Sequence, residues 1–416
     1  MKKYLSILFA LSVYSTQSSA GGYQIPEMSI KGMGMGNAFT AVADDASAIW
    51  FNPAGIAFQK GKVLTIGGDI IKPSHEFTPN GGSTTYSAKE RTFFVPHGYI
   101  TYNSPEHPVV FGLGINSPFG LSTNWRNSGA PFASESTAVK MAKSVSFSEI
   151  KMANINPTIA YKINDRLSIG GGISYYHVDE VHLDNQILLL EGDGNGWGAN
   201  FGLMYKADRF DFGLNYRSQV KADIDGVATG GPDLGVLGAA ALIGVTSTAK
   251  TSVTFPDIFN IGVAYRPDNK LLLSFDLDWT RWETFDSIDI TYGTSALNAI
   301  TGANSSIAEN WKNTLALRMG AEWKYNNKFK SRIGYVFDPT PIRDTDFSPR
   351  LPGEDRQLIT LGFGYEQSQN LTIDMAYAYV WLDDRNQTAS SAVTTSYNGE
   401  YKGNTHIFSA SLTYRF

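Results

Sequence analysis

The chain offers few residues that could carry out covalent chemistry. It contains no cysteine, which excludes a disulfide framework, a cysteine–zinc site and a thiol nucleophile. Its 6 histidines are scattered along the chain, and none joins a nucleophile motif such as G-x-S-x-G. We therefore expect no catalysis, no metal and no cofactor. A catalytic site assembled in space, as in a lipase or protease, is the alternative from this class.

Two basic side chains are candidates for holding a ligand. Residues 311–325 alternate in polarity, and Lys312 and Arg318 fall on the face opposite the leucines. An apolar pocket needs only a few such polar groups to fix the head of an amphipathic ligand. The alternative is an ion pair with acids predicted on the same inward side, such as Asp276 or Asp278.

A run of apolar residues at 234–245 is a candidate binding surface. It falls in a predicted loop, where exposed apolar surface normally marks a binding site. The alternative is a short loop helix that packs on a neighbouring loop. The candidate capture residues are Leu234, Val236, Leu237, Leu242 and Ile243.

The elements that must position these residues are β-strands, because apolar and polar residues alternate with a period of two. The alternation is clearest in 209–217, 271–280 and 370–382, so each segment has an apolar face and a polar or small face. The strands run about 10 to 20 residues, and about 9–11 tilted residues cross a bilayer. Aromatic residues stand at the ends of the apolar stripes, which is typical of the interfacial girdles of membrane barrels.

The predicted connections are alternately short and long. Short polar turns are predicted near 103–106, 164–165, 207–208, 268–269, 326–327 and 368–369. Longer links are predicted near 73–91, 117–146, 190–195, 222–249, 291–310, 339–354 and 384–403. The pattern predicts an all-β transmembrane antiparallel barrel of about 14 strands, since outer-membrane barrels have an even strand number and short turns on one side. A secreted β-sandwich or propeller is the alternative.

The N-terminal residues predict export and a plug. Residues 1–20 have a basic start, an apolar run and a small-residue cleavage site, which is the pattern of a signal peptide. Residues 21–61 do not alternate and are rich in glycine and small residues, and a barrel of about 14 strands leaves a lumen wider than its own side chains fill. We therefore predict a signal peptide at 1–20, an N-terminal hatch at 21–61 and a transmembrane barrel at 62–416. The net charge of −5 argues against a nucleic-acid partner.

Short motifs run through the chain from the N-terminal segment to the last strand. They are GYQI at 22–25, GMGNA at 34–38, ADDA at 43–46, NPA at 52–54, NINP at 154–157, NYRS at 215–218, FPD at 255–257, WTRW at 279–282 and DPTP at 338–341. In combination they resemble the FadL/TodX family of outer-membrane transporters of long-chain fatty acids and hydrocarbons. The chain also ends in Phe416, which resembles the signal that the outer-membrane assembly machinery reads.

The resemblance implies passive transport of hydrophobic molecules, with long-chain fatty acids as the first choice and monoaromatic hydrocarbons as the alternative. It implies capture by the outer loops, binding in the lumen, movement of the hatch and lateral exit at a kinked third strand. Asn52, Pro53 and Ala54 match the hatch motif, and Lys312 matches a basic residue that receives a carboxylate. The residues that match the kink are Asn116, Ser117, Pro118, Phe119 and Gly120, and proline and glycine are known to interrupt β pairing.

Alternatives to parts of this scheme are open. Pro118 could instead begin the loop after the third strand, and the family's second basic contact falls among residues 180–184, which hold no Lys or Arg. A general porin would need an open lumen, and residues 21–61 are too few for the plug of a TonB-coupled receptor. The expected partners are a hydrophobic small molecule, outer-membrane lipid and lipopolysaccharide, and the barrel assembly machinery. We expect a monomer in the outer membrane of a Gram-negative bacterium.

Overall fold

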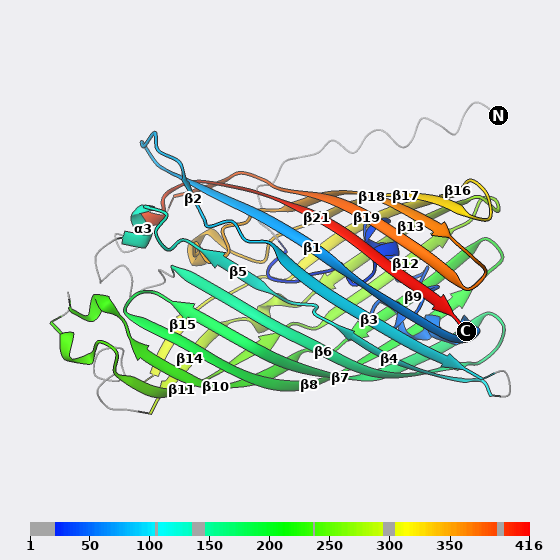
Figure 1. Cartoon of the computed structure of the whole chain (residues 1–416), viewed down its shortest axis with the longest axis horizontal. Coiled ribbons are helices and arrows are strands. Elements are labelled where there is room, and N and C mark those ends of the chain that lie inside the picture. Colours follow the sequence, from blue (N-terminus) through cyan, green and yellow to red (C-terminus); the bar gives the residue numbers. More distant parts are fainter. Residues whose placement is uncertain (1–20, 105–106, 135–145, 236–237, 294–303, 389–394) are drawn as a thin grey trace.

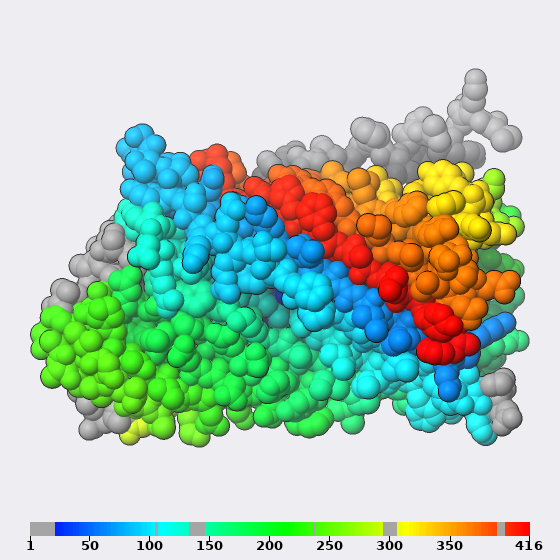
Figure 2. Space-filling model, in the orientation of Figure 1, coloured from blue at the N-terminus to red at the C-terminus, as the bar shows by residue number. Residues whose placement is uncertain are grey.

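The protein folds as a closed antiparallel β-barrel of 14 strands (Figure 1). The structure, a computed structural model, describes residues 21–104, 107–134, 146–235, 238–293, 304–388 and 395–416, so the predicted signal peptide lies outside the described residues. The first and last strands close the barrel, because Val63–Pro79 pairs in register with 399–415. Figure 2 shows these two strands side by side on the outer surface. No helix in the described part of the chain is long and apolar enough to cross a membrane.

Most barrel strands are continuous, whereas the third, seventh, eighth, ninth and tenth consist of two segments each. The continuous strands are β1 (Gly61–Pro79), β3 (Phe93–Asn103), β6 (Phe147–Lys162), β7 (Leu167–Asp184), β8 (Leu188–Lys206), β17 (Phe329–Asp338), β18 (Arg356–Glu366), β19 (Leu371–Leu382) and β21 (Gly399–Arg415). The two-segment strands are β4 (Val109–Asn116) with β5 (Leu121–Asn124), β9 (Phe210–Arg217) with β10 (Val220–Gly230), β11 (Thr246–Phe255) with β12 (Ile258–Tyr265), β13 (Leu271–Thr280) with β14 (Ser287–Tyr292), and β15 (Asn304–Ala308) with β16 (Thr314–Lys324).

The remaining elements are short. In the long loops and at their edges lie β2 (Tyr86–Ser87), α3 (Pro131–Ser134), η2 (Pro232–Gly235), η3 (Ala240–Leu242), η4 (Trp282–Thr284), η5 (Asp344–Asp346), β20 (Arg385–Gln387) and η6 (Thr395–Tyr397). The N-terminal segment contains α1 (Ile30–Met33), α2 (Ala48–Phe51) and η1 (Pro53–Phe58).

The alternation in the sequence corresponds to the two faces of the wall. In β9, Phe210, Phe212 and Leu214 are exposed on the outside, whereas Asp211 and Asn215 are buried inside. Side chains at i and i+2 share one face of a strand, so a strand with hydrocarbon outside and a filled polar interior must alternate in this way. The predicted fold class is confirmed.

The predicted turns and most of the predicted long links join neighbouring strands, but one link is wrong. Residues 190–195 lie within β8 and pair with β10, and the connection between β7 and β8 is 185–187. A Cβ on Gly194 would lie 2.0 Å from Asp223 O, so glycine here permits close approach of a neighbouring backbone.

The N-terminal segment, residues 21–60, lies inside the barrel, nearer the end with the short turns (dark blue in Figure 1). Ser29 caps α1 by accepting a hydrogen bond from Gly32 N at 3.2 Å, and Asn52 caps η1 with Pro53 at its first position. These helices are too short to be stable alone. Their buried apolar side chains, such as Met33 and Ile56, are covered by the wall.

Glycines in the wall let the backbone of the N-terminal segment lie directly on the strands. A Cβ on Gly334 would lie 2.0 Å from Gly36 N, and one on Gly320 would lie 2.3 Å from Met35 O. The same kind of close approach occurs at Gly170, Gly202, Gly213 and Gly262. Residues 34–54 are therefore fitted to the wall at the level of the backbone.

Candidate ligand site and exit path

The third barrel strand is interrupted where the sequence predicts the kink. β4 ends at Asn116, β5 begins at Leu121, and both pair with β6. β4 also pairs with β3, but within the described residues β5 has no ladder with β3. Residues Phe93–His97 of β3 are therefore paired only with β1, and the wall between β3 and β5 lacks a backbone ladder in the described structure. Pro118 lies inside this interrupted strand and does not begin a loop.

The N-terminal segment supplies backbone partners to the interruption. Ile25 N donates to Pro118 O at 2.8 Å, and Gly120 N donates to Tyr23 O at 3.0 Å. These two bonds make an antiparallel bridge between the start of the described chain and the broken strand. Backbone groups that the break removes from the ladder are thus satisfied by a segment that does not belong to the wall.

A relay of buried side chains makes a second connection. Asn154 Nδ2 donates to Asn116 Oδ1 at 2.9 Å, Asn116 Nδ2 donates to the Tyr99 hydroxyl at 3.0 Å, and that hydroxyl donates to Met28 O at 2.8 Å. All four residues are buried. A displacement of the N-terminal segment would therefore alter the hydrogen bonds at the interruption.

A cavity of about 550 Å³ lies behind the gap between β3 and β5. We call it the wall cavity. Its lining includes Phe93–Pro96 from β3, Phe119–Leu121 from the broken strand, and Tyr23–Ile25 and Glu27 from the N-terminal segment. Small-molecule sites occupy about 300–1,000 Å³, so the wall cavity can hold an extended hydrophobic molecule.

A smaller cavity of about 70 Å³, the loop-side cavity, lies toward the long loops. Its aliphatic lining residues include Ile150, Val181, Leu183, Ile224, Val253, Ile288 and Ile290. The stretch 180–184, where the resemblance implies a basic contact, thus contributes apolar side chains. The residues that line both cavities are Tyr23, Leu121, Ile150, Ile342 and Leu351. The two cavities therefore adjoin.

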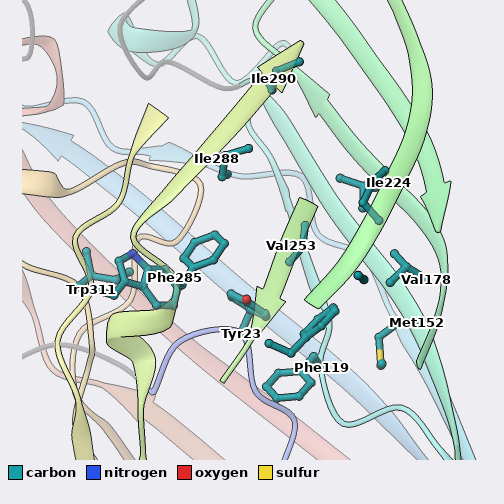
Figure 3. Close-up of a cluster of buried hydrophobic side chains, with 14 of the residues drawn as sticks. Tyr23, Phe119, Met152, Val178, Ile224, Val253, Phe285, Ile288, Ile290 and Trp311 are labelled. Carbon is teal, nitrogen blue, oxygen red and sulfur yellow. The ribbon is translucent and has the colours of Figure 1, made fainter. Parts of the chain in front are cut away.

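Tyr23 stands where the cavities meet and is the centre of an aromatic cluster (Figure 3). Its ring centroid lies 5.0 Å from that of Trp282, 5.4 Å from Phe285, 5.6 Å from Trp311 and 5.8 Å from Phe119. Tilted and edge-on aromatic pairs at such distances contribute about 0.5–1.5 kcal/mol each beyond their buried area. Tyr23 is therefore held mainly by ring packing.

Within the described structure, four buried polar atoms of residues that line the loop-side cavity have no hydrogen-bond partner. They are the Tyr23 hydroxyl, Trp311 Nε1, Ser148 Oγ and Thr251 Oγ1. Burial raises the pKa of the Tyr23 hydroxyl, so this group is a donor. Buried polar groups are normally paired, and unpaired donors in an apolar cavity suit a ligand with one polar, hydrogen-bond-accepting end.

The two predicted head-group residues lie away from these cavities. Arg318 is buried inside the barrel and forms an ion pair with Asp278, in agreement with the alternative prediction. Lys312 lies before β16, is half-buried, and its backbone nitrogen donates to Pro341 O at 2.9 Å. Neither side chain lines the loop-side or the wall cavity.

Two basic residues line the loop-side cavity in the described structure, the exposed Lys250, which pairs with Asp225, and Arg350, which the sequence analysis missed. Arg350 is buried, forms an ion pair with Glu309 and donates from Nε to Ser348 Oγ at 3.2 Å. Arg350 belongs to the long link after β17, where no alternation indicates which way a side chain points. Only the packing of that loop over the barrel brings it to the cavity.

The predicted capture stretch is only partly exposed. Leu234 is fully buried, Leu242 is half-buried against the same hydrophobic cluster, and Ile243 is 46% exposed. Val236 and Leu237 lie outside the described residues. The prediction of an exposed capture surface is wrong for Leu234, because the short helix η2 packs on the neighbouring β7–β8 connection, where Asp233 N donates to Gln186 O at 3.1 Å, as the alternative predicted.

The predicted hatch motif joins the N-terminal segment to the wall. Asn52 Nδ2 donates to Thr40 O and to Leu203 O on β8, each at 3.0 Å, and Asn52 Oδ1 accepts from Ala54 N at 3.2 Å. Pro53 packs on Gly170 and Gly202. Asn52 therefore links two turns of the segment to one strand.

Among the described residues, no group of histidine and acidic side chains could hold a metal ion.

Comparison with known proteins identifies a family that shares this sequence pattern. The family model described as "Outer membrane protein transport protein (OMPP1/FadL/TodX)" matches residues 11–416. The long-chain fatty acid transport protein of Escherichia coli O6:H1 is 24% identical over 455 residues, covering 99% of this chain and 98% of that protein. Outer membrane protein P1 of Haemophilus influenzae is 24% identical over 445 residues, covering 91% of this chain and 90% of that protein.

Two crystal structures share the fold. A Pseudomonas aeruginosa FadL homologue has a TM-score of 0.78 at 19% identity, covering 95% of this chain and all of that one (100%). The Pseudomonas putida toluene transporter TodX has a TM-score of 0.69 at 14% identity, covering 95% and 98%. Because the family model spans nearly the whole chain, the protein belongs to the OMPP1/FadL/TodX family of outer-membrane transport proteins.

Proposed function

We propose that the protein carries hydrophobic molecules passively through the outer membrane. The ligand is captured by the long loops, binds in the loop-side cavity, passes Tyr23 into the wall cavity and leaves laterally between β3 and β5. The single observation that carries this proposal is the contact of the two cavities at Tyr23, directly behind a wall segment without a backbone ladder.

Long-chain fatty acids are the first choice of substrate. The loop-side cavity combines an aliphatic lining with unpaired donors on Tyr23, Trp311, Ser148 and Thr251, which suits the acceptor head of a fatty acid. The adjoining wall cavity of about 550 Å³ has room for the chain. The ion pair of Arg350 with Glu309 adds a cation close to these donors. The name of the Escherichia coli relative, a long-chain fatty acid transport protein, supports the same choice.

Monoaromatic hydrocarbons are the second candidate. The rings around Tyr23 offer edges and faces to a flat aromatic guest, and Lys312, which the resemblance assigned to a carboxylate, lines neither cavity. The fold of the toluene transporter TodX supports this alternative. We assign no catalytic role to any residue.

We further infer that residues 1–20 are a cleaved export signal and that residues 21–61 act as a hatch that closes the lumen to polar solutes. The dense packing of 28–60 against the wall glycines supports the closing role. Outer-membrane lipid, lipopolysaccharide and the barrel assembly machinery are the other partners of this proposal, with a monomer as the working unit.

The test is uptake of labelled oleate by a bacterium that lacks its own fatty-acid transporter and is supplied with this gene. Restored uptake supports the fatty-acid choice. A folded barrel in the membrane that gives no oleate uptake removes that choice, and labelled toluene then tests the second. Swelling assays with sugars provide the control, because a closed hatch should keep polar solutes out.

A further inference from the structure

Glu27 is a buried carboxyl group that faces the proposed exit. It is 3% exposed and lines the wall cavity together with Tyr23 and Arg356. Among the described residues, it makes no ion pair and no hydrogen bond with another side chain. An isolated carboxylate in such a place is costly, so the group takes up a proton.

The positive charges around Glu27 offset the effect of its burial only in part. Arg356 has the largest electrostatic effect of these charges on Glu27. Its guanidinium, however, pairs with Asp338 and donates from Nη1 to Gln24 O at 3.1 Å. Asp69 adds negative charge, and its own neighbours are His97, at 3.7 Å, and Ser409. The charges that act on Glu27 from the surrounding strands are Arg356 on β18, Asp69 on β1 and Arg318 on β16. Asp69 lies near His97 on β3, and Arg356 pairs with Asp338 on β17. The other titratable groups that line the same cavity are His75 on β1 and Glu149 and Lys151 on β6, and Lys151 pairs with Glu149 and Glu180.

We propose that Glu27 is a protonated acid that gives its proton to the carboxylate of a departing fatty acid, which then enters the bilayer as the neutral acid. The Oε–H bond of Glu27 breaks, an O–H bond forms on the ligand carboxylate, and nothing is oxidised or reduced. Glu27 is left as a carboxylate and later regains a proton from water. This inference rests on the proposed lateral exit of a fatty acid.

The physical reason for such a step is the cost of desolvation. Moving a carboxylate from a hydrated site into hydrocarbon is far more costly than moving the neutral acid. In the wall cavity, the two carboxyl groups would share one proton, because two adjacent carboxylates repel each other. Burial raises the pKa of Glu27 to about 7, so near neutral pH a substantial fraction of Glu27 carries a proton that it can transfer.

The experiment compares cells that carry wild type, Glu27→Gln, Glu27→Asp or Glu283→Gln. Glu283 is an exposed glutamate that accepts from Asn313 and lines neither cavity. Uptake of labelled oleate and of labelled oleyl alcohol is measured over a pH series around 7, and uptake by cells without the protein is subtracted. Barrel assembly is checked by the shift in gel mobility on heating.

We expect oleate uptake by wild type to fall about tenfold per pH unit above the pKa of Glu27, as the acid form is depleted. Glutamine has no acidic proton to give, so Glu27→Gln should move oleate at least about tenfold more slowly, a factor that corresponds to one pKa unit. Its oleate uptake should also lack this pH dependence. It should move oleyl alcohol at the wild-type rate. Glu27→Asp should keep the pH dependence, and Glu283→Gln should match wild type.

An assembled Glu27→Gln protein that moves oleate at the wild-type rate and with the wild-type pH dependence would overturn the proton transfer but not the proposed transport function. A wild type that takes up toluene but not oleate would also overturn the proton transfer, and transport of hydrophobic molecules would still stand. A folded wild type that moves neither would contradict the proposed function itself.

A spectroscopic measurement covers the case in which Glu27→Gln fails to assemble. The purified wild type, labelled with 13C at its glutamate carboxyls, should show a protonated-carboxyl infrared band at neutral pH that Glu27→Asp lacks. Addition of oleate should reduce that band. A Glu27 that is already ionised at neutral pH, or a band that oleate leaves unchanged, would refute the proton transfer.

Discussion

The N-terminal segment consists of two regions that are held in different ways. Residues 28–60, the docked region, lie with their backbone on wall glycines and make buried hydrogen bonds, such as Thr40 N to Asp276 Oδ2 at 2.7 Å. Residues 21–27, the tip, are held by the rings around Tyr23 and by two backbone bonds to the broken third strand. Only the tip borders both cavities.

This difference indicates which region can move. Breaking the docked region leaves buried donors and acceptors unsatisfied, which costs about 1–3 kcal/mol for each group. Ring contacts at the tip are less directional, and a hydrophobic ligand can replace them. We therefore expect the docked region to act as a fixed stopper and the tip to be the element that a ligand displaces.

The largest effect is expected from filling a glycine contact of the docked region. In Gly334→Val, the new side chain would overlap the backbone at Gly36, so the docked region must leave the wall and transport should be lost nearly completely. Overpacking typically costs about 1–3 kcal/mol and occasionally more. The denaturant midpoint of the purified barrel measures the effect. Gly98→Val is the matched control, since a Cβ there meets only Thr65 O at 3.8 Å, and equal midpoints would contradict the docking.

The second effect concerns the tip. Tyr23→Ala removes a buried aromatic ring, a change that costs about 3–5 kcal/mol in a packed core, so the tip should detach while the docked region stays in place. Hydrogen exchange should rise in 21–27 and stay unchanged in 28–60. Tyr23→Phe keeps the ring and should keep the protection. A rise that extends into 28–60 would show that the two regions move as one.

A smaller effect is expected at the link between the docked region and β8. Asn52→Ala leaves the carbonyls of Thr40 and Leu203 without their donor, at about 1–3 kcal/mol, and the barrel wall should still assemble. Oleate uptake should fall while the heat-shifted gel band stays normal. Asn313→Ala, which removes an exposed amide that donates to Glu283, is the control. Wild-type oleate uptake by Asn52→Ala would show that Asn52 is not needed to anchor the docked region to β8.

The two regions should also differ in their response to pH near neutrality. The pKa of Glu27 in the tip is raised above its ordinary value to about 7 by burial. Its contribution to docking is therefore complete below the ordinary pKa of a glutamate and is lost as pH rises through about 7. Hydrogen exchange of 21–27, corrected for the intrinsic rate, should accelerate above that pH. Glu27→Gln should abolish the dependence, and a tip that tightens at higher pH would contradict the sign.

The smallest effect is expected for Lys312→Ala. Its side chain lines neither cavity, and substitutions away from such features typically change free energies by no more than about 0.5 kcal/mol. Oleate uptake should change less than about twofold, which is the rate equivalent of that energy. A fall in oleate uptake of tenfold or more would contradict this expectation and would show that Lys312 contacts the ligand.

The sequence predicted the wall and the location of the break well. Alternation at 209–217 appears as aromatic residues outside and polar residues inside β9, because a lipid exterior and a filled interior act on every strand alike. The alternation is a local signal, so a single chain is enough to read it. The interruption was located by the family resemblance, and proline and glycine at 118 and 120 agree with it because neither residue supports a regular ladder.

Other features of the site could not be read locally. Thr40 and Asp276 are bonded although 236 residues separate them, and Arg350 reaches the loop-side cavity only through the packing of its loop. The period of a strand gives the direction of a side chain but not its partner. The sequence by itself therefore determined a membrane barrel with an internal N-terminal segment, and the family resemblance located the break in the third strand. Tertiary packing alone decided that Tyr23 and Glu27 face the cavities, because that depends on which distant backbones the wall glycines admit.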